Sequence, residues 1–199
     1  MKVCVAVPHG GTVKGRLMSD LIASLFALRE SIGFVWAEIE GTLGPHNRWL
    51  AGQQAIQTDC DYLWLMDNDM SIPIDALPRL LESQKDIICA DYSYRRLPLM
   101  STVKVLDENG QIAIWDRTTP DSSRPFPCHA TGFGCMLIKV SALQRIPQPW
   151  FALSWGPDGG LDKTDDVWFC EQAKKVGIET WCDPTLDVYH IGDFLYACK

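Results

Sequence analysis

Strand-like and helix-like segments alternate through the first ninety residues of this 199-residue chain. Short β-branched and apolar runs predict strands, and apolar residues at helical spacing predict helices between them. Strands that are separated by helices are typical of βαβ units and a parallel sheet. The sequence therefore predicts an α/β fold with a mainly parallel central sheet flanked by helices. The predicted strands are residues 3–7, 34–39, 62–66 and 87–90, and the predicted helices are residues 17–31, 47–58 and 74–83.

The third predicted strand ends in two carboxylates, Asp67 and Asp69, with Asn68 between them. Buried carboxylates are costly, so a pair at the end of an apolar strand needs solvent, a cation or a positively charged ligand. In an extended chain the two side chains project to the same side. Two hard oxygen ligands suit Mg²⁺ or Mn²⁺, which also bind water and phosphate oxygens, so a diphosphate is the expected partner. A solvated turn is the alternative, because Asp and Asn are ordinary turn residues.

The second half of the chain has a different pattern. Residues 100–115 are β-rich, and the sequence Asp-Glu-Asn-Gly at 107–110 predicts a hairpin turn. Residues 118–127 are polar and proline-rich, which predicts a loop. A glycine-rich bend containing Gly132 then leads into a strand, and such glycines either admit a ligand close to the backbone or form a β-bulge. We expect a small β-rich part after the α/β half.

Two further features have both a structural and a functional interpretation. Asp165 and Asp166 precede a predicted helix at 167–176, where the helix macrodipole alone favours acidic residues. His190 follows a short apolar run, and a single histidine in that position is more often structural than catalytic. Neither feature identifies a site by itself.

Length and composition predict a globular domain in a reducing compartment. The chain is long enough for one domain with a full core, and 47% of its residues are hydrophobic. No apolar run approaches the roughly 18 residues of a transmembrane helix, and the N-terminus reads as a strand rather than a signal peptide. We therefore expect a soluble cytoplasmic protein, in the host cytoplasm if its source is viral.

The cysteines and the net charge argue against two other classes, disulfide- or zinc-stabilised proteins and nucleic-acid-binding proteins. The eight cysteines are scattered through apolar segments without a Cys-x-x-Cys pair, which favours buried free thiols over disulfides or zinc. The net charge of −7 argues against sequence-independent nucleic-acid binding, although the basic strip at 94–96 offers one local phosphate contact. The loop after the first strand lacks both the Gly-x-Gly-x-x-Gly fingerprint and a Walker lysine.

In their order and separation, the motifs resemble the GT-A class of nucleotide-sugar glycosyltransferases. They are most similar to the inverting family-2 group, in particular its short bacterial, phage and viral members. The resemblance covers almost the whole chain. It consists of the first strand ending at Pro8, Asn47-Arg48 opening a helix, Asp67-Asn68-Asp69, Thr131-Gly132-Phe133-Gly134, Asp165-Asp166-Val167-Trp168-Phe169, Lys175-Val176-Gly177, Asp183-Pro184 and Val188-Tyr189-His190.

The resemblance implies a metal site and a catalytic base. Asp67, Asp69 and His190 would hold Mn²⁺ or Mg²⁺ against the diphosphate of the donor. Asp166 would be the general base that takes the proton of the acceptor hydroxyl. Asp165 stands where the family usually has glutamate, and the shorter side chain is expected to change acceptor contacts.

The resemblance also implies a donor site. Pro8 and His9 would line the nucleotide pocket, Glu38 or Glu40 would contact the base, and Arg48 would approach the diphosphate. The bend at Gly132 would frame the sugar. A flexible loop at 156–160 would order over the bound donor. Sugar stacking is implied for four aromatic residues, at least two of which we expect to be core instead: Trp150, Phe151, Trp155 and Trp168.

These implications define the expected function. Residues 1–199 would form one glycosyltransferase domain, with a nucleotide-sugar half at 1–100 and an acceptor half at 101–199. It would move a sugar from a nucleoside-diphosphate sugar, UDP-sugar first, to a carbohydrate or other hydroxyl acceptor with inversion. The alternatives are a retaining GT-A enzyme, a sugar-phosphate nucleotidyltransferase and a non-catalytic nucleotide-sugar-binding module.

Overall fold

The computed structural model describes residues 1–119, 123–192 and 195–196. Its centre is a seven-stranded sheet in the order β2-β1-β3-β9-β5-β12-β8. Strands β2, β1, β3, β5 and β12 run in one direction, while β9 and β8 run in the other. The expected mainly parallel sheet is thus confirmed. Its strands are β1 (Lys2–Ala6), β2 (Gly33–Ala37), β3 (Tyr62–Leu65), β5 (Ile87–Ala90), β8 (Phe126–Cys128), β9 (Met136–Lys139) and β12 (Thr180–Asp183).

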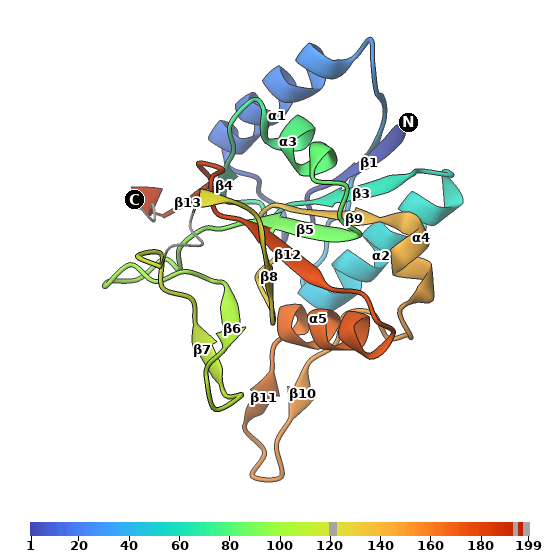
Figure 1. Cartoon of the computed structure of the whole chain (residues 1–199). Helices are drawn as coiled ribbons and strands as arrows, with labels where there is room; N and C mark the ends of the chain where they lie inside the picture. The colour runs from blue at the N-terminus through green and yellow to red at the C-terminus, as the bar shows by residue number, and fades with distance from the viewer. Residues whose placement is uncertain (120–122, 193–194, 197–199) are drawn as a thin grey trace.

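Helices cover both faces of this sheet (Figure 1). On one face lie α1 (Gly15–Leu28) and α3 (Ala76–Glu82), and on the other lie α2 (Gly44–Gln57), α4 (Val140–Arg145) and α5 (Asp165–Lys175). There is one hydrophobic core on each face of the sheet, and successive residues of a strand pack into them alternately. In β3, Leu63 and Leu65 pack into one core and Trp64 packs into the other. This period of two places apolar side chains on both faces. The apolar runs predicted from the sequence are therefore two-sided strands.

The position of β9 differs from a simple βαβ series. It enters antiparallel between β3 and β5, with Leu65 opposite Met136 and Cys89 opposite the same residue. The short helix α4, which the sequence analysis did not predict, follows β9 directly. Both come from the second half of the chain, so the two halves share one sheet. Pairing with two strands that are distant in sequence is a tertiary event that local periodicity does not encode.

Three smaller sheets complete the fold. β4 (Met70–Ser71), β13 (Tyr189–Ile191) and β14 (Leu195–Tyr196) form one in the order β14-β13-β4. The hairpins β6–β7 (Lys104–Leu106, Ile112–Ile114) and β10–β11 (Ser154–Trp155, Leu161–Lys163) project from the helical layer that contains α5 (Figure 1). The turn predicted at 107–110 joins β6 to β7, with Gly110 at a φ of +74°. The proline-rich segment 118–127 includes three residues, 120–122, that lie outside the described part of the chain.

Burial of the cysteines agrees with their apolar sequence context. Of the seven described, six are buried, Cys128 is half-buried, and all seven are unpaired. Burial raises the pKa of Cys4, Cys135 and Cys170 to about 12, which keeps these thiols protonated and unreactive. In the described ranges, none of the helices has the length and apolarity needed to cross a membrane.

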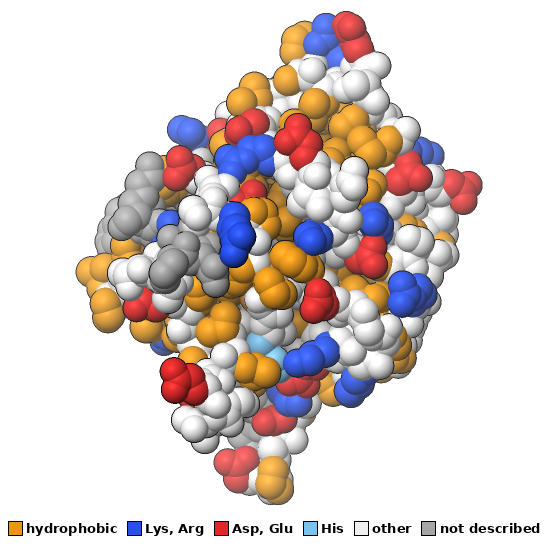
Figure 2. Space-filling model, viewed as in Figure 1, with side chains coloured by type: hydrophobic (Ala, Val, Ile, Leu, Met, Phe, Trp, Pro, Cys, Tyr) orange, Lys and Arg blue, Asp and Glu red, His pale blue; other side chains and the backbone are white. Residues whose placement is uncertain are grey.

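Acidic and basic side chains are interspersed over the face shown in Figure 2. This face has no broad area of a single sign. The picture agrees with the net charge of −7, which gives no electrostatic basis for binding nucleic acid without sequence preference.

Candidate active site

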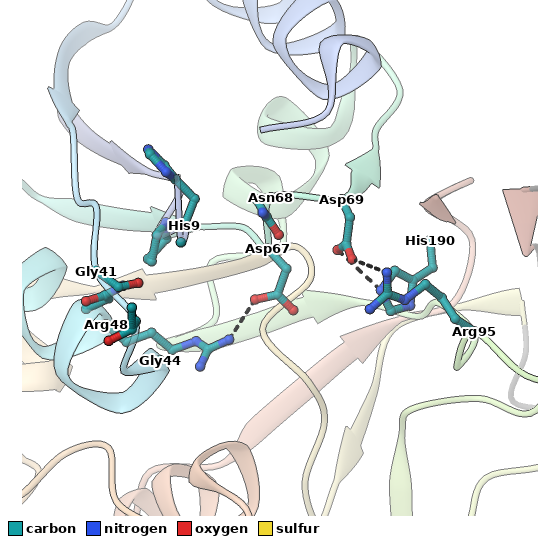
Figure 3. A pocket seen from close by; sticks show the side chains of 13 residues that line it. His9, Gly41, Gly44, Arg48, Asp67, Asn68, Asp69, Arg95 and His190 are labelled. Carbon is teal, nitrogen blue, oxygen red and sulfur yellow. Dashed lines mark hydrogen bonds and ion pairs between the residues drawn. The ribbon is translucent and has the colours of Figure 1, made fainter. Parts of the chain in front are cut away.

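A pocket of about 390 Å³ lies at the carboxyl ends of β1, β2 and β3. The chain places β2 on one side of β1 and β3 on the other, and α1 and α2 cover opposite faces. This is a topological switch point, where loops diverge and leave a crevice for a ligand. The pocket is lined by loops after β1 (8–10), after β2 (41–44) and after β3 (67–69), by the start of α2, and by Arg95 and His190 (Figure 3).

Arg48 connects two carboxylates at one side of this pocket. Its Nη2 lies 2.7 Å from Asp67 Oδ1 and its Nη1 lies 2.6 Å from Asp165 Oδ2. The guanidinium also lies over the ring of Phe133, with Cζ 4.7 Å from the centroid. Burial alone would lower the pKa of Arg48, but the charges of Asp67 and Asp165 outweigh burial and raise it. Arg48 is thus a fixed charge that ties the loop after β3 to the start of α5.

Asp69 has two partners of its own on the other side of the pocket. Arg95 Nη1 lies 2.9 Å from its Oδ2, and His190 Nε2 lies 3.3 Å from its Oδ1. The pairing of β13 with β4 sets His190 opposite Met70, and Ile191 N–H donates to the Asp69 carbonyl at 2.7 Å. Burial alone would raise the pKa of Asp69, but its interactions with the protonated form of the His190 ring and then with Arg95 outweigh burial and lower it.

The Asp67 and Asp69 carboxylates line one pocket but contact different side chains: Asp67 contacts Arg48, and Asp69 contacts Arg95 and His190 (Figure 3). Residues 67–69 form a turn rather than an extended strand, and the Asn68 amide donates to the Thr12 carbonyl at 2.6 Å. The expected alternation of side chains along a strand therefore does not set their positions. Among the residues that the structure describes, no group of three His, Cys, Asp or Glu side chains is arranged to hold a metal ion.

Asp69 and His190 nevertheless fit a divalent cation. His190 Nδ1 lies 3.0 Å from the Ser93 carbonyl, which can only accept, so Nδ1 carries the hydrogen. In a neutral ring the lone pair of Nε2 then faces Asp69 Oδ1, which is buried without a hydrogen-bond partner. A backbone carbonyl on the other ring nitrogen is how proteins orient metal-binding histidines. Two protein ligands suffice for Mg²⁺ or Mn²⁺ when water and phosphate complete the coordination.

Asp166 is the second residue of α5, after Asp165, and is absent from the wall of the pocket. Val167 N–H donates to Asp166 Oδ1 at 2.8 Å, and the Thr164 hydroxyl bonds the same oxygen. Lys104 Nζ on β6 forms an ion pair with Asp166 Oδ2 at 4.0 Å, which is too long for a hydrogen bond. The carboxylate is fixed through one oxygen and keeps the other available.

The remaining predicted residues divide into two groups. Pro8 and His9 line the pocket with Arg48, Asp67, Asp69 and His190. Glu38 and Glu40, one of which was expected to contact the base, both line a different surface pocket beside α2, and Glu40 also pairs with His9 in an isolated parallel bridge. Two of the four aromatic residues, Trp150 and Phe151, are buried in the core as expected, and Trp155 is 65% exposed. The loop 156–160 is the tight turn of the β10–β11 hairpin.

Gly132 and Gly134 pack against Tyr92. A Cβ at Gly132 would lie 2.0 Å from the Tyr92 hydroxyl, and one at Gly134 would lie 2.5 Å from Tyr92 Cζ. Gly134 N–H donates to the same hydroxyl at 3.0 Å. Burial raises the pKa of Tyr92, so the phenol stays neutral and accepts this hydrogen bond. These glycines therefore have a packing reason that is independent of any ligand.

This packing predicts that Gly132→Ala lowers the free energy of unfolding by about 1–3 kcal/mol, the usual cost of overfilling a core. Gly15→Ala is the control, because a Cβ there has no neighbour within 4 Å. Urea unfolding of both variants measures the difference. Adding Tyr92→Phe to Gly132→Ala removes the clashing oxygen and is expected to recover part of the loss. Equal stability of the two alanine variants would contradict the packing explanation.

Arg95 is a charged pocket residue that the sequence analysis did not place. It belongs to the basic strip at 94–96, which was noted only as a possible phosphate contact. Arg95 is on the loop after β5, and β5 is separated from β3 by the inserted strand β9. The basic strip was the available signal, but which of its two arginines faces Asp69 depends on the conformation of the loop.

Of three comparisons with known proteins, the one with solved structures identifies the fold. No family model matches the chain, and no curated protein matches its sequence. The crystal structure of A197 from STIV is similar over 100% of this chain and 95% of that chain, with a TM-score of 0.62 and 19% identity. GalNAc-T7, solved with UDP, GalNAc and Mn²⁺, is similar over 96% of this chain and 43% of that chain, with a TM-score of 0.53 and 12% identity. At these identities the likeness shows a GT-A-like fold.

Proposed function

We propose that this chain is a metal-dependent inverting glycosyltransferase that uses a nucleoside-diphosphate sugar. The observation that carries the proposal is the pairing of Asp69 Oδ1, buried and without a hydrogen bond, with the oriented Nε2 of His190. Both atoms belong to the pocket at the switch point of a GT-A-like sheet. The proposed nucleotide position and the proposed cation ligands thus lie in the same pocket.

Asp69 and His190 would hold the cation, and Asp67 would reach it directly or through water. When bound, Mn²⁺ or Mg²⁺ supplies neutralisation of the charge that develops on the departing nucleoside diphosphate. The similarity to GalNAc-T7, a GT-A glycosyltransferase solved with UDP and Mn²⁺, supports this choice of ligands. UDP is accordingly the first nucleotide to test.

Asp166 is the proposed general base. Inverting transfer requires a carboxylate that takes the proton of the acceptor hydroxyl while the hydroxyl oxygen attacks the anomeric carbon from the face opposite the leaving group. The oxygen of Asp166 that is not held by Val167 N–H is available for this proton. The links from Asp166 through its neighbour Asp165 and Arg48 to Asp67 would hold the base at a fixed place relative to the donor.

Arg48 lies in the wall of the pocket, and we infer that it acts on the diphosphate position through its charge rather than by direct contact. Both of its terminal nitrogens are engaged by carboxylates at 2.6 and 2.7 Å, and its side chain is 17% exposed. An arginine that is held in this way is pre-organised and adds a positive field to the diphosphate position at little entropic cost. Without Arg48, the part-buried carboxylates of Asp67 and Asp165 would be left without a compensating charge. Arg48 therefore also stabilises the loop after β3.

The test is thermal unfolding against UDP, GDP, CDP and dTDP, each with and without Mn²⁺. A ligand that binds only the folded state raises stability by RT ln(1 + [L]/Kd), about 2.7 kcal/mol at one hundred times Kd. We expect one nucleotide to raise the melting temperature strongly when Mn²⁺ is present and weakly without it. Absence of any shift at saturating concentrations would contradict the diphosphate–metal site.

Product analysis separates the competing functions. The anomeric configuration of the product distinguishes inverting from retaining transfer. A nucleotidyltransferase would consume a nucleoside triphosphate and a sugar phosphate and release pyrophosphate. A binding module would show the nucleotide-dependent shift without turnover.

A further inference from the structure

Arg95 occupies the place beside Asp69 where a cation is expected. Its guanidinium lies 2.9 Å from Asp69 Oδ2, and its side chain is 49% exposed. Within the described part of the chain, this ion pair is the one polar contact of Arg95. The contrast with Arg48 is clear, because Arg48 is held by two carboxylates and an aromatic ring and is 17% exposed. Arg95 is therefore free to change partners, whereas Arg48 is not.

A divalent cation at Asp69 and Arg95 compete for the same carboxylate. In the ligand-free protein Arg95 and Arg48 balance the charges of Asp69 and Asp67 around the pocket. A doubly charged ion held at Oδ1 would repel the guanidinium of Arg95 and weaken its pairing with Oδ2 of the same carboxylate. The displaced side chain is still in the wall of the pocket, where its planar set of donors matches the oxygens of a diphosphate.

We propose that Arg95 exchanges partners during donor binding: it pairs with Asp69 in the free protein and with the donor diphosphate once a divalent cation takes Asp69. This inference rests on the proposed function and adds a residue to it. It makes Arg95 the element that couples the metal to the nucleotide. The metal alone binds against the competing arginine, and the diphosphate relieves the repulsion between them, so each ligand strengthens binding of the other.

The test uses Arg95→Gln, with Arg96→Gln as the matched control. Arg96 is the adjacent arginine, and its guanidinium lies 5.0 Å over the ring of Tyr94 rather than at Asp69. Electron paramagnetic resonance measures free Mn²⁺ in titrations without nucleotide, and calorimetry measures UDP binding at saturating Mn²⁺. In Arg95→Gln we expect Mn²⁺ alone to bind several-fold more tightly and UDP to bind about tenfold more weakly. Arg96→Gln is expected to match the wild type in both titrations.

Arg95→Lys provides a second variant. Lysine keeps the charge that competes with the metal but lacks the guanidinium fork, so Mn²⁺ alone should bind as in the wild type while UDP binds more weakly. The opposite shifts in Arg95→Gln, and the loss confined to UDP in Arg95→Lys, distinguish partner exchange from a structural role. If both affinities fall together in Arg95→Gln, or if neither differs from Arg96→Gln, the partner exchange is wrong.

The wild-type titrations test the proposed function separately. If wild-type protein binds neither Mn²⁺ nor any of the four nucleotides, the diphosphate–metal site fails, and the role of Arg95 fails with it. If the wild type binds both and Arg95→Gln shows no difference, the site stands and only the role of Arg95 is overturned.

Discussion

Asp166→Asn is expected to reduce glycosyl transfer by about 10²–10⁴-fold while nucleotide binding stays at the wild-type level. Asparagine has nearly the same shape and can still accept the Val167 N–H bond, so the start of α5 is preserved. What it loses is the ability to take a proton. The loss should therefore be in kcat, measured with the donor identified by the nucleotide panel.

Asp162→Asn is the control for this experiment. Asp162 is an exposed carboxylate on β11, four residues earlier, and accepts a hydrogen bond from the Ser154 hydroxyl at 3.1 Å. We expect its transfer rate to equal that of the wild type. Transfer that persists in Asp166→Asn would remove Asp166 as the base and direct attention to another carboxylate or to a retaining mechanism.

Asp69→Ala is expected to abolish the effect of Mn²⁺ on nucleotide binding and to lower transfer with it. Loss of groups that only orient a metal ligand typically costs 10–100-fold in affinity, so loss of the ligand itself should cost more than about 100-fold. Calorimetry of UDP with and without Mn²⁺ measures the coupling. Asp75→Ala is the control, because that carboxylate is 55% exposed and pairs with Arg79 at 3.8 Å, away from the pocket. Mn²⁺-dependent UDP binding that survives in Asp69→Ala would exclude Asp69 as a ligand.

The same variant also has a pH signature in the ligand-free protein. Because the pKa of Asp69 is lowered in the folded state, its ionised form stabilises the fold. That contribution is fully present above the unfolded-state pKa of the carboxyl and is lost as pH falls through the folded-state pKa. The difference in unfolding free energy between the wild type and Asp69→Ala should thus be largest near neutral pH and shrink in acid. A constant difference across that range would contradict the assigned interactions.

Much of the pocket was predictable because several of its residues lie immediately after strands. Pro8 and Asp67 each follow a predicted strand, and parallel strands bring their carboxyl ends to one edge of a sheet. Glu38 shows the limit of this argument. It lies within the predicted strand 34–39 and directly after the observed β2, yet it lines another pocket, because the end of β2 and the path of the chain beyond it are set by tertiary packing.

The sequence alone determined the α/β class, the alternation of strands and helices, and the carboxylate pair after β3, because these depend on local periodicity and on the cost of burying charge. Only the tertiary structure decided which side chains meet. His190 reaches Asp69 because β13 pairs with β4, and Arg48 reaches Asp165 across 117 residues of chain. Such contacts are set by strand order, register and loop conformation, which arise from packing of the whole chain rather than from any local segment.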